Sequence, residues 1–171
     1  MLIDKKEIQN HTDDAILFAD GVNFINTSQW ILAYPIFEYL DQQAKDKSVP
    51  LCYNIALCYT QAKQYPEAIA ALESALNKIK VSSIVSNPIN PLPANLWLNE
   101  YDSNHYLSGL NETAMTFNIN LIRVRIRRLL VDLHLTLENW QEVIRLSSLP
   151  DMDKCKNVQE ASIVAKSKIN S

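Results

Sequence analysis

Apolar residues recur at helical spacing on both sides of a short polar break in residues 51–76. Ile55, Tyr59 and Ala62 precede the polar pair Lys63-Gln64, and the periodicity resumes at Ala68, Leu72, Ala75 and Leu76. Two amphipathic helices joined by so tight a turn must lie antiparallel, because only that geometry buries both apolar stripes together. The pattern therefore predicts a helical hairpin.

This hairpin resembles the tetratricopeptide repeat (TPR), a helix-turn-helix unit of about 34 residues. The matching positions are Ile55, Ala56, Tyr59, Tyr65, Ala68, Leu72 and Ala75. The chain departs from the family pattern at the turn glycine, which is Lys63, and at the closing proline, which is Lys80. The resemblance implies hairpins stacked into a right-handed superhelix, in which the first helix of each unit lines a concave groove that binds peptides.

Two further stretches follow the same pattern less completely. Gly21 and Val131 would occupy the position of Ala56, which lies 35 residues after Gly21 and 75 residues before Val131. Residues 121–128 also alternate like a β-strand, but the longer apolar run that follows favours a helix. The 75-residue interval leaves room for a degenerate extra repeat, although an irregular insertion fits its prolines better.

We therefore predict a single all-α domain over residues 1–171, built as a right-handed, antiparallel helix-hairpin (TPR-like) superhelix of about three repeats. The expected units are repeat 1 at 13–46, repeat 2 at 49–80, an irregular insertion at 81–118, a degenerate repeat 3 at 119–150 and a capping helix at 153–170. Within the insertion, residues 96–107 are expected to form a short helix, and Asn111 could cap another that leads into the arginine-rich stretch.

Composition supports helices and excludes several functional classes. The chain has 171 residues, only two of them glycine, which disfavours turn-dense β-sandwiches and phosphate-binding loops. A net charge of −3 gives no bulk attraction for nucleic acid. No apolar run reaches the ~20 residues that a membrane-spanning helix needs, and residues 1–7 carry charges where a signal peptide is apolar. We therefore expect a cytoplasmic protein without membrane insertion.

No catalytic or metal-binding pattern appears in the sequence. The glycine-rich, HExxH and GxSxG motifs are absent, and the histidines are far apart along the chain. His134 is expected to be an ordinary helix residue rather than a catalytic base. Cys52 and Cys58 would point about 120° apart on one helix and are expected to be buried apolar residues rather than metal ligands. We expect neither an enzyme nor a cofactor.

The only basic cluster is Arg123, Arg125, Arg127 and Arg128. On a helix, Arg123 and Arg127 share one edge while Arg125 and Arg128 share another. A solvated helix face, an edge that binds carboxylate or phosphate, and a nucleic-acid footprint remain open, in that order of weight.

The resemblance places a partner-binding surface on the first helix of each unit. It includes Phe18, Val22, Tyr53, Asn54, Leu57, Arg125, Arg128 and Asp132. Some members of the family clamp a C-terminal carboxylate here. Asn54 and Arg125 fall at two clamp positions, but Phe18, Val22 and Leu129 occupy the others and cannot donate hydrogen bonds, so chaperone-tail binding is not expected.

The predicted function is protein–protein interaction, as an adaptor, scaffold, assembly factor or escort that binds a protein or peptide in the groove. The alternative is a structural subunit that self-associates as a homo-oligomer or that completes a larger complex. The insertion adds three possibilities through its apolar residues Leu92, Trp97, Leu98, Tyr101 and Tyr106. It could plug the groove, form the contact surface itself, or simply cover an exposed helix pair.

Overall fold

The computed structural model describes residues 5–82 and 92–171, and every regular element in these ranges is helical. The elements are α1 (Lys5–Asn26), α2 (Trp30–Gln43), α3 (Val49–Gln61), α4 (Tyr65–Ser82), α5 (Ala94–Asp102), α6 (Ala114–Phe117), α7 (Ile119–Thr136), α8 (Trp140–Ser147) and α9 (Lys156–Ile169), with the 3-10 turns η1 (His105–Leu107) and η2 (Met152–Lys154). The all-α prediction is confirmed, and the strand alternative for residues 121–128 is wrong because they lie within α7.

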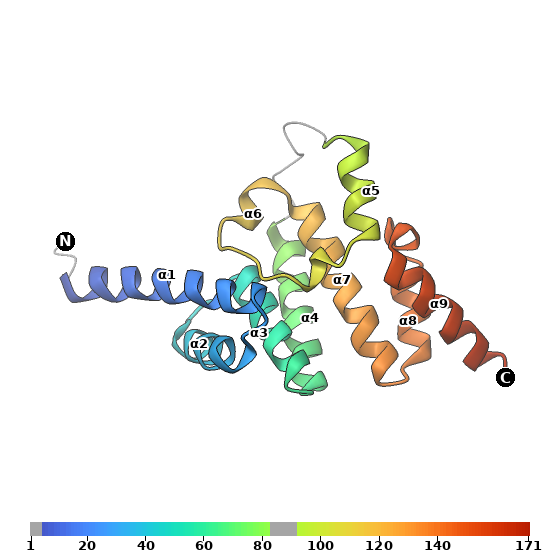
Figure 1. The fold of residues 1–171 in the computed structure, drawn as a ribbon, viewed down its shortest axis with the longest axis horizontal. Helices are drawn as coiled ribbons and strands as arrows, with labels where there is room; N and C mark the ends of the chain where they lie inside the picture. The colour runs from blue at the N-terminus through green and yellow to red at the C-terminus, as the bar shows by residue number, and fades with distance from the viewer. Residues whose placement is uncertain (1–4, 83–91) are drawn as a thin grey trace.

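Helices that are neighbours in the chain form hairpins, and the hairpins pack in a row (Figure 1). The hairpins are α1–α2, α3–α4 and α7–α8; α2 packs on α3, α4 on α7, and α8 on α9. Because α4 contacts α7 directly, the third hairpin continues the row although residues 83–118 separate the two helices in sequence.

The three hairpins share one turn geometry. The residue at the turn has a positive φ in each case, 58° at Ser28, 60° at Lys63 and 58° at Glu138. The same three backbone hydrogen bonds surround each turn; in the second hairpin they run from Ala62, Lys63 and Gln64 to the carbonyls of Cys58, Thr60 and Tyr59. The turns are 63 − 28 = 35 and 138 − 63 = 75 residues apart, which are the spacings found from the small residues in the sequence.

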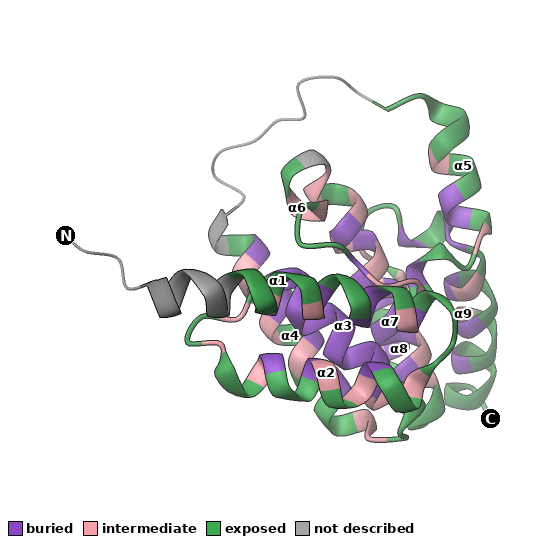
Figure 2. Cartoon of the chain, turned by 60° about the vertical axis from the view of Figure 1, so that its left-hand side comes forward, coloured by how far each residue is buried: buried purple, intermediate pink, exposed green. Residues whose placement is uncertain are grey.

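Buried apolar side chains lie between the helices of each hairpin and between successive hairpins (Figure 2). In the first hairpin the Phe37 ring packs edge-on to Phe18, with ring centroids 5.4 Å apart. Gly21 makes this possible, because a Cβ atom there would lie only 2.8 Å from the Phe37 ring. Tyr34 on α2 donates a hydrogen bond to the Gln64 side chain at 2.8 Å, which ties the first hairpin to the turn of the second.

Residues 92–118 form no hairpin. The short helix expected at 96–107 is α5 followed by η1, and α5 projects from the row of hairpins (Figure 1). The expected helix before the arginine-rich stretch is α6, but its N-cap residue is Thr113 rather than Asn111, and no side chain caps it. The Asn118 side chain accepts the Leu121 N–H at 3.0 Å and caps α7. The expectation of an irregular insertion also covers residues 83–91, which lie outside the described residues.

Candidate interaction site

Side chains of α1, α3 and α7 form one face of the molecule, and residues 100–110 lie across it. We call these the α1/α3/α7 face and the covering segment. The first helix of each hairpin contributes to the face, because the second helix of each hairpin packs against the next hairpin in the row. The face therefore brings together side chains that are far apart in the sequence.

Three side chains of the face bind the backbone of the covering segment. The Asn54 amide donates to the Leu110 carbonyl and accepts the Leu110 N–H, both at 2.8 Å. The Asn26 side chain accepts the Gly109 N–H at 2.8 Å, and the Tyr53 hydroxyl donates to the Tyr106 carbonyl. Such contacts hold a peptide chain without depending on its side chains.

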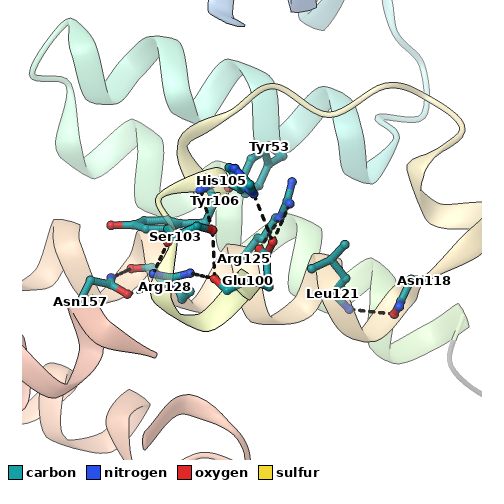
Figure 3. A network of polar contacts seen from close by, with 10 residues as sticks. All are labelled: Tyr53, Glu100, Ser103, His105, Tyr106, Asn118, Leu121, Arg125, Arg128 and Asn157. Atoms are coloured by element: carbon teal, nitrogen blue, oxygen red, sulfur yellow. Dashed lines mark hydrogen bonds and ion pairs between the residues drawn. The ribbon is translucent and has the colours of Figure 1, made fainter. Parts of the chain in front are cut away.

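Arg125 binds the Glu100 carboxylate through two hydrogen bonds (Figure 3). Its Nε donates to Glu100 Oε1 at 2.7 Å and its Nη2 to Oε2 at 2.9 Å, with the two side chains 14% and 9% exposed. A two-bond pair of this kind, shielded from water, is among the stronger charge-assisted contacts in proteins. Arg125 therefore binds a carboxylate, and that carboxylate comes from the same chain.

Arg128 is fully buried and holds the covering segment at two carbonyls (Figure 3). Its Nη1 donates to the Glu100 carbonyl at 2.7 Å and its Nη2 to the Ser103 carbonyl at 2.9 Å. Its Nε donates to the Asn157 side chain of α9, also at 2.7 Å. Arg125 and Arg128 therefore do not form a solvated helix face, because both guanidinium groups bind the covering segment.

Tyr106 is the central side chain of the covering segment. Its ring lies 4.1 Å from the guanidinium carbon of Arg128, and its hydroxyl donates to an Asp132 carboxylate oxygen. Asn157 donates to the other Asp132 oxygen at 2.8 Å, so α9 helps to hold the carboxylate of α7 that accepts this hydroxyl. Stacking on a cation combined with a hydrogen bond to a carboxylate selects tyrosine over phenylalanine or an aliphatic residue.

The site residues predicted from the sequence all lie on α1, α3 and α7. Tyr53, Asn54, Arg125, Arg128 and Asp132 bind the covering segment, and a Cβ atom on Gly109 would lie 3.2 Å from Val22. Phe18 and Leu57 are buried, with Phe18 packed against Phe37 within the first hairpin. Five of the eight side chains therefore form hydrogen bonds with the chain's own residues 100–110.

Sequence reasoning missed Asn26, Glu100 and Asn157. Asn26 is the last residue of α1, and Asn157 lies in the first turn of α9, where a polar side chain normally faces water. Glu100 lies within α5, whose short sequence gives no repeat register. One signal was available for Glu100, because an acidic residue in the insertion is a natural partner for the arginine edge of α7.

Burial sets the protonation of the site. It raises the pKa of the Tyr53 and Tyr106 phenols above their usual value, and the Asp132 carboxylate raises that of Tyr106 further. Both hydroxyls therefore stay protonated and act as hydrogen-bond donors at neutral pH. Burial also raises the pKa of Asp132, while the hydrogen bonds from Tyr106 and Asn157 act in the opposite direction.

The other candidate reactive groups are inert in this fold. All three cysteines are buried, and burial raises the thiol pKa of Cys58 to about 12 and of Cys155 to about 11. A thiol that stays protonated is a poor nucleophile. Burial lowers the pKa of His134, whose Nδ1 lies 3.2 Å from the Asn139 amide nitrogen in the third turn. His134, in the last turn of α7, thus contacts the turn of the third hairpin.

Two of the four arginines lie outside the site. Arg123 donates to the Asn120 side chain at 2.7 Å, while Arg127 has a buried Nε with no hydrogen-bond partner among the described residues. Burial and the neighbouring Arg123 and Arg145 lower the pKa of Arg127. For the edge formed by Arg123 and Arg127, a solvated helix face, a site for carboxylate or phosphate, and a nucleic-acid footprint all remain open.

Within residues 5–82 and 92–171, no cluster of three or more histidine, cysteine and acidic side chains could hold a metal ion. In the same ranges, no helix has the length and apolar character needed to cross a membrane. No protein-family model matches the chain, and it matches neither a curated protein nor a solved structure.

Proposed function

We propose that this protein is a non-enzymatic, TPR-like interaction module that binds a peptide or partner segment on the α1/α3/α7 face. One observation carries the proposal: this face already holds a chain segment that belongs to no hairpin, through side chains of α1, α3 and α7 that bind its backbone. An adaptor, scaffold, assembly factor or escort would use such a surface, and a right-handed superhelix is the arrangement that the repeated turns favour.

The chemistry of the buried groups supports a binding role over catalysis. The buried tyrosines, the thiols and His134 are neutral and packed, so none of these groups is an activated nucleophile or base. The cations at the site are paired with the chain's own Glu100 and carbonyls, which argues against nucleic acid as the ligand. A reducing cytoplasm, which keeps the buried cysteines as thiols, is part of the proposal.

A second candidate function, a self-associating structural subunit, is favoured by exposed apolar side chains at the two ends of the row. Ile31 on α2 is 86% exposed and lies in a surface hollow with Trp30 and Tyr34. Ile163 on α9 is 70% exposed and lies in another hollow with Ile144. Contact between these ends of two copies would bury both residues.

Selection of binding peptides tests the first proposal. A displayed random-peptide library is selected against the intact protein and against Asn54→Leu, which removes both hydrogen bonds to a bound backbone. Thr60→Val is the matched control on the same helix, because the Thr60 hydroxyl donates to the Ala56 carbonyl of its own helix, at 2.7 Å, and not to the covering segment.

The interaction module predicts peptides that bind the intact protein and Thr60→Val alike and that lose affinity for Asn54→Leu. Failure to enrich any peptide, combined with a mass that rises with concentration in sedimentation, would instead establish the structural subunit. Substitution of Ile31 and Ile163 by serine should then return the protein to a monomer.

A further inference from the structure

We infer that residues 100–110 are a built-in ligand of the α1/α3/α7 face, and that a partner protein binds by replacing them with a segment of the same chemistry and the same backbone shape, a helix end followed by a 3-10 turn. That segment carries a glutamate, a tyrosine six residues later and an aliphatic residue four residues after the tyrosine. The inference rests on the proposed function and adds to it the partner's sequence pattern and the way in which the face becomes available.

The backbone contacts do not depend on the side chains of the bound segment. Asn54, Asn26 and Tyr53 bind the N–H and carbonyl groups of Leu110, Gly109 and Tyr106, and Arg128 binds the carbonyls of Glu100 and Ser103. A peptide from another protein offers the same groups at the same spacing. The face therefore has no contact here that only this chain could satisfy.

Three side chains of the covering segment supply the sequence pattern. Glu100 fits the Arg125 guanidinium by charge and by two parallel hydrogen bonds. Tyr106 fits between the Arg128 guanidinium and the Asp132 carboxylate, and Leu110 is 4% exposed beside Asn54. Six residues separate the first two and four the last two, which defines the spacing required of a partner.

The hairpins do not need the covering segment to hold their shape. Each helix of the face has its own hairpin partner, α2 for α1, α4 for α3 and α8 for α7. Upstream of the segment the chain has few contacts, because α5 projects from the row and its Leu96 and Leu98 are 57% and 63% exposed (Figures 1 and 2). Departure of residues 100–110 would thus leave a folded, open face.

A covalently attached ligand lowers the apparent affinity for a free one in proportion to the time for which it occupies the site. Weakening the attached segment must then strengthen binding of a free peptide, even though no residue of the face is changed. A face that simply forms part of a core would show no such exchange. This difference makes the inference testable.

A disulfide between α1 and the covering segment provides the decisive variant. A Cβ atom on Gly109 would lie 3.5 Å from the Cβ atom of Ile25, a separation that a disulfide can bridge. The full chain carrying Ile25→Cys and Gly109→Cys is oxidised to lock the segment in place, and disulfide formation is verified by mass. The three native cysteines are buried and do not compete for oxidation.

The probe is a fluorescein-labelled peptide with the sequence of residues 98–111, and binding is followed by anisotropy. The reduced double-cysteine protein should bind the probe at least about tenfold more tightly than the oxidised protein. A control peptide in which glutamine and phenylalanine replace the residues that correspond to Glu100 and Tyr106 should bind neither form measurably.

A second variant tests the same exchange without new cysteines. Glu100→Gln with Tyr106→Phe weakens the covering segment while the α1/α3/α7 face stays intact, so affinity for the probe should rise about tenfold or more over the unaltered protein. Arg125→Glu added to this variant should abolish the gain, because it removes the guanidinium that binds the probe's glutamate.

The outcomes separate this inference from the proposed function. Equal probe binding by the oxidised and reduced proteins would overturn the inference and leave an interaction module with a different binding surface. Absence of probe binding to every variant would overturn it as well, and the library-selected peptides would then decide the function on their own. If the weakened variant forms dimers that exclude the probe, the occupant is a second copy of the chain, and the inferred partner protein is wrong.

Discussion

The hairpins and residues 92–118 are held in place by opposite kinds of contact. The hairpins are held by apolar side chains at helical spacing, with small residues such as Gly21 where two helices approach closely. The covering segment is held by polar side chains that bind its backbone, by the buried ion pair of Arg125 and Glu100, and by the burial of only a few apolar side chains of its own, such as Leu110. The first kind of contact belongs to a folding core, and the second resembles a complex between a protein and a peptide.

This difference bears on which parts of the molecule can exchange partners. Apolar packing between neighbouring helices is cooperative, so its loss affects the whole row of hairpins. A segment bound through its backbone can be lost while its binding surface stays folded. Substitutions that remove one kind of contact at a time should therefore produce different patterns of damage.

The largest effect is expected from Phe37→Ala in the core of the first hairpin. Phe37 is fully buried and packs edge-on against Phe18, so its removal should lower the free energy of unfolding by about 3–5 kcal/mol. Urea denaturation followed by circular dichroism measures the change. Tyr39→Ala on the same helix is the control. Because Tyr39 is 46% exposed, its removal should lower the free energy of unfolding by less than about 0.5 kcal/mol. A loss below 1 kcal/mol for Phe37→Ala would mean that the hairpins are not held by this core.

A smaller and local effect is expected from Arg128→Met. Methionine fills similar space but leaves the carbonyls of Glu100 and Ser103 and the Asn157 side chain without the donors that the guanidinium supplies. Because the lost hydrogen bonds involve a charged group, the free energy of unfolding should fall by about 2–3 kcal/mol. Hydrogen exchange should show the change mainly in residues 100–110, with α3 and α4 still protected.

Arg123→Met serves as the matched control for this substitution. Arg123 lies on the same helix and donates only to the Asn120 side chain among the contacts found for it, so the change should be close to neutral. If Arg128→Met raises exchange in α3 and α4 as much as in residues 100–110, the covering segment is part of the cooperative core, and the contrast between the two regions fails.

The same contrast explains what could be read from the sequence. The helical hairpins and their spacings of 35 and 75 residues were predictable, because burial of a helix face leaves a periodic apolar pattern. The covering segment left no such pattern, since carbonyl and N–H groups are identical in every residue. The family resemblance was enough to place Asn54 and Arg125 on one face. The groups that they bind, the Leu110 backbone and the Glu100 carboxylate, could not be predicted because they depend on how residues 92–118 fold.

The smallest effect is expected from Lys63→Gly, which replaces the turn residue by the one that the resembled family has there. Lys63 has a φ of 60°, a left-handed conformation that strains any residue with a Cβ atom. Glycine removes this strain but also raises the conformational entropy of the unfolded chain. The free energy of unfolding, measured by urea denaturation, should show a net rise of about 0.5–1 kcal/mol. Gln61→Gly, in the last turn of α3, is the control and should instead cost about 0.5–1 kcal/mol, because it weakens a helix without relieving strain. If Lys63→Gly destabilises the protein, contacts of the lysine side chain hold the turn, and the geometry it shares with Ser28 and Glu138 has a different cause in each hairpin.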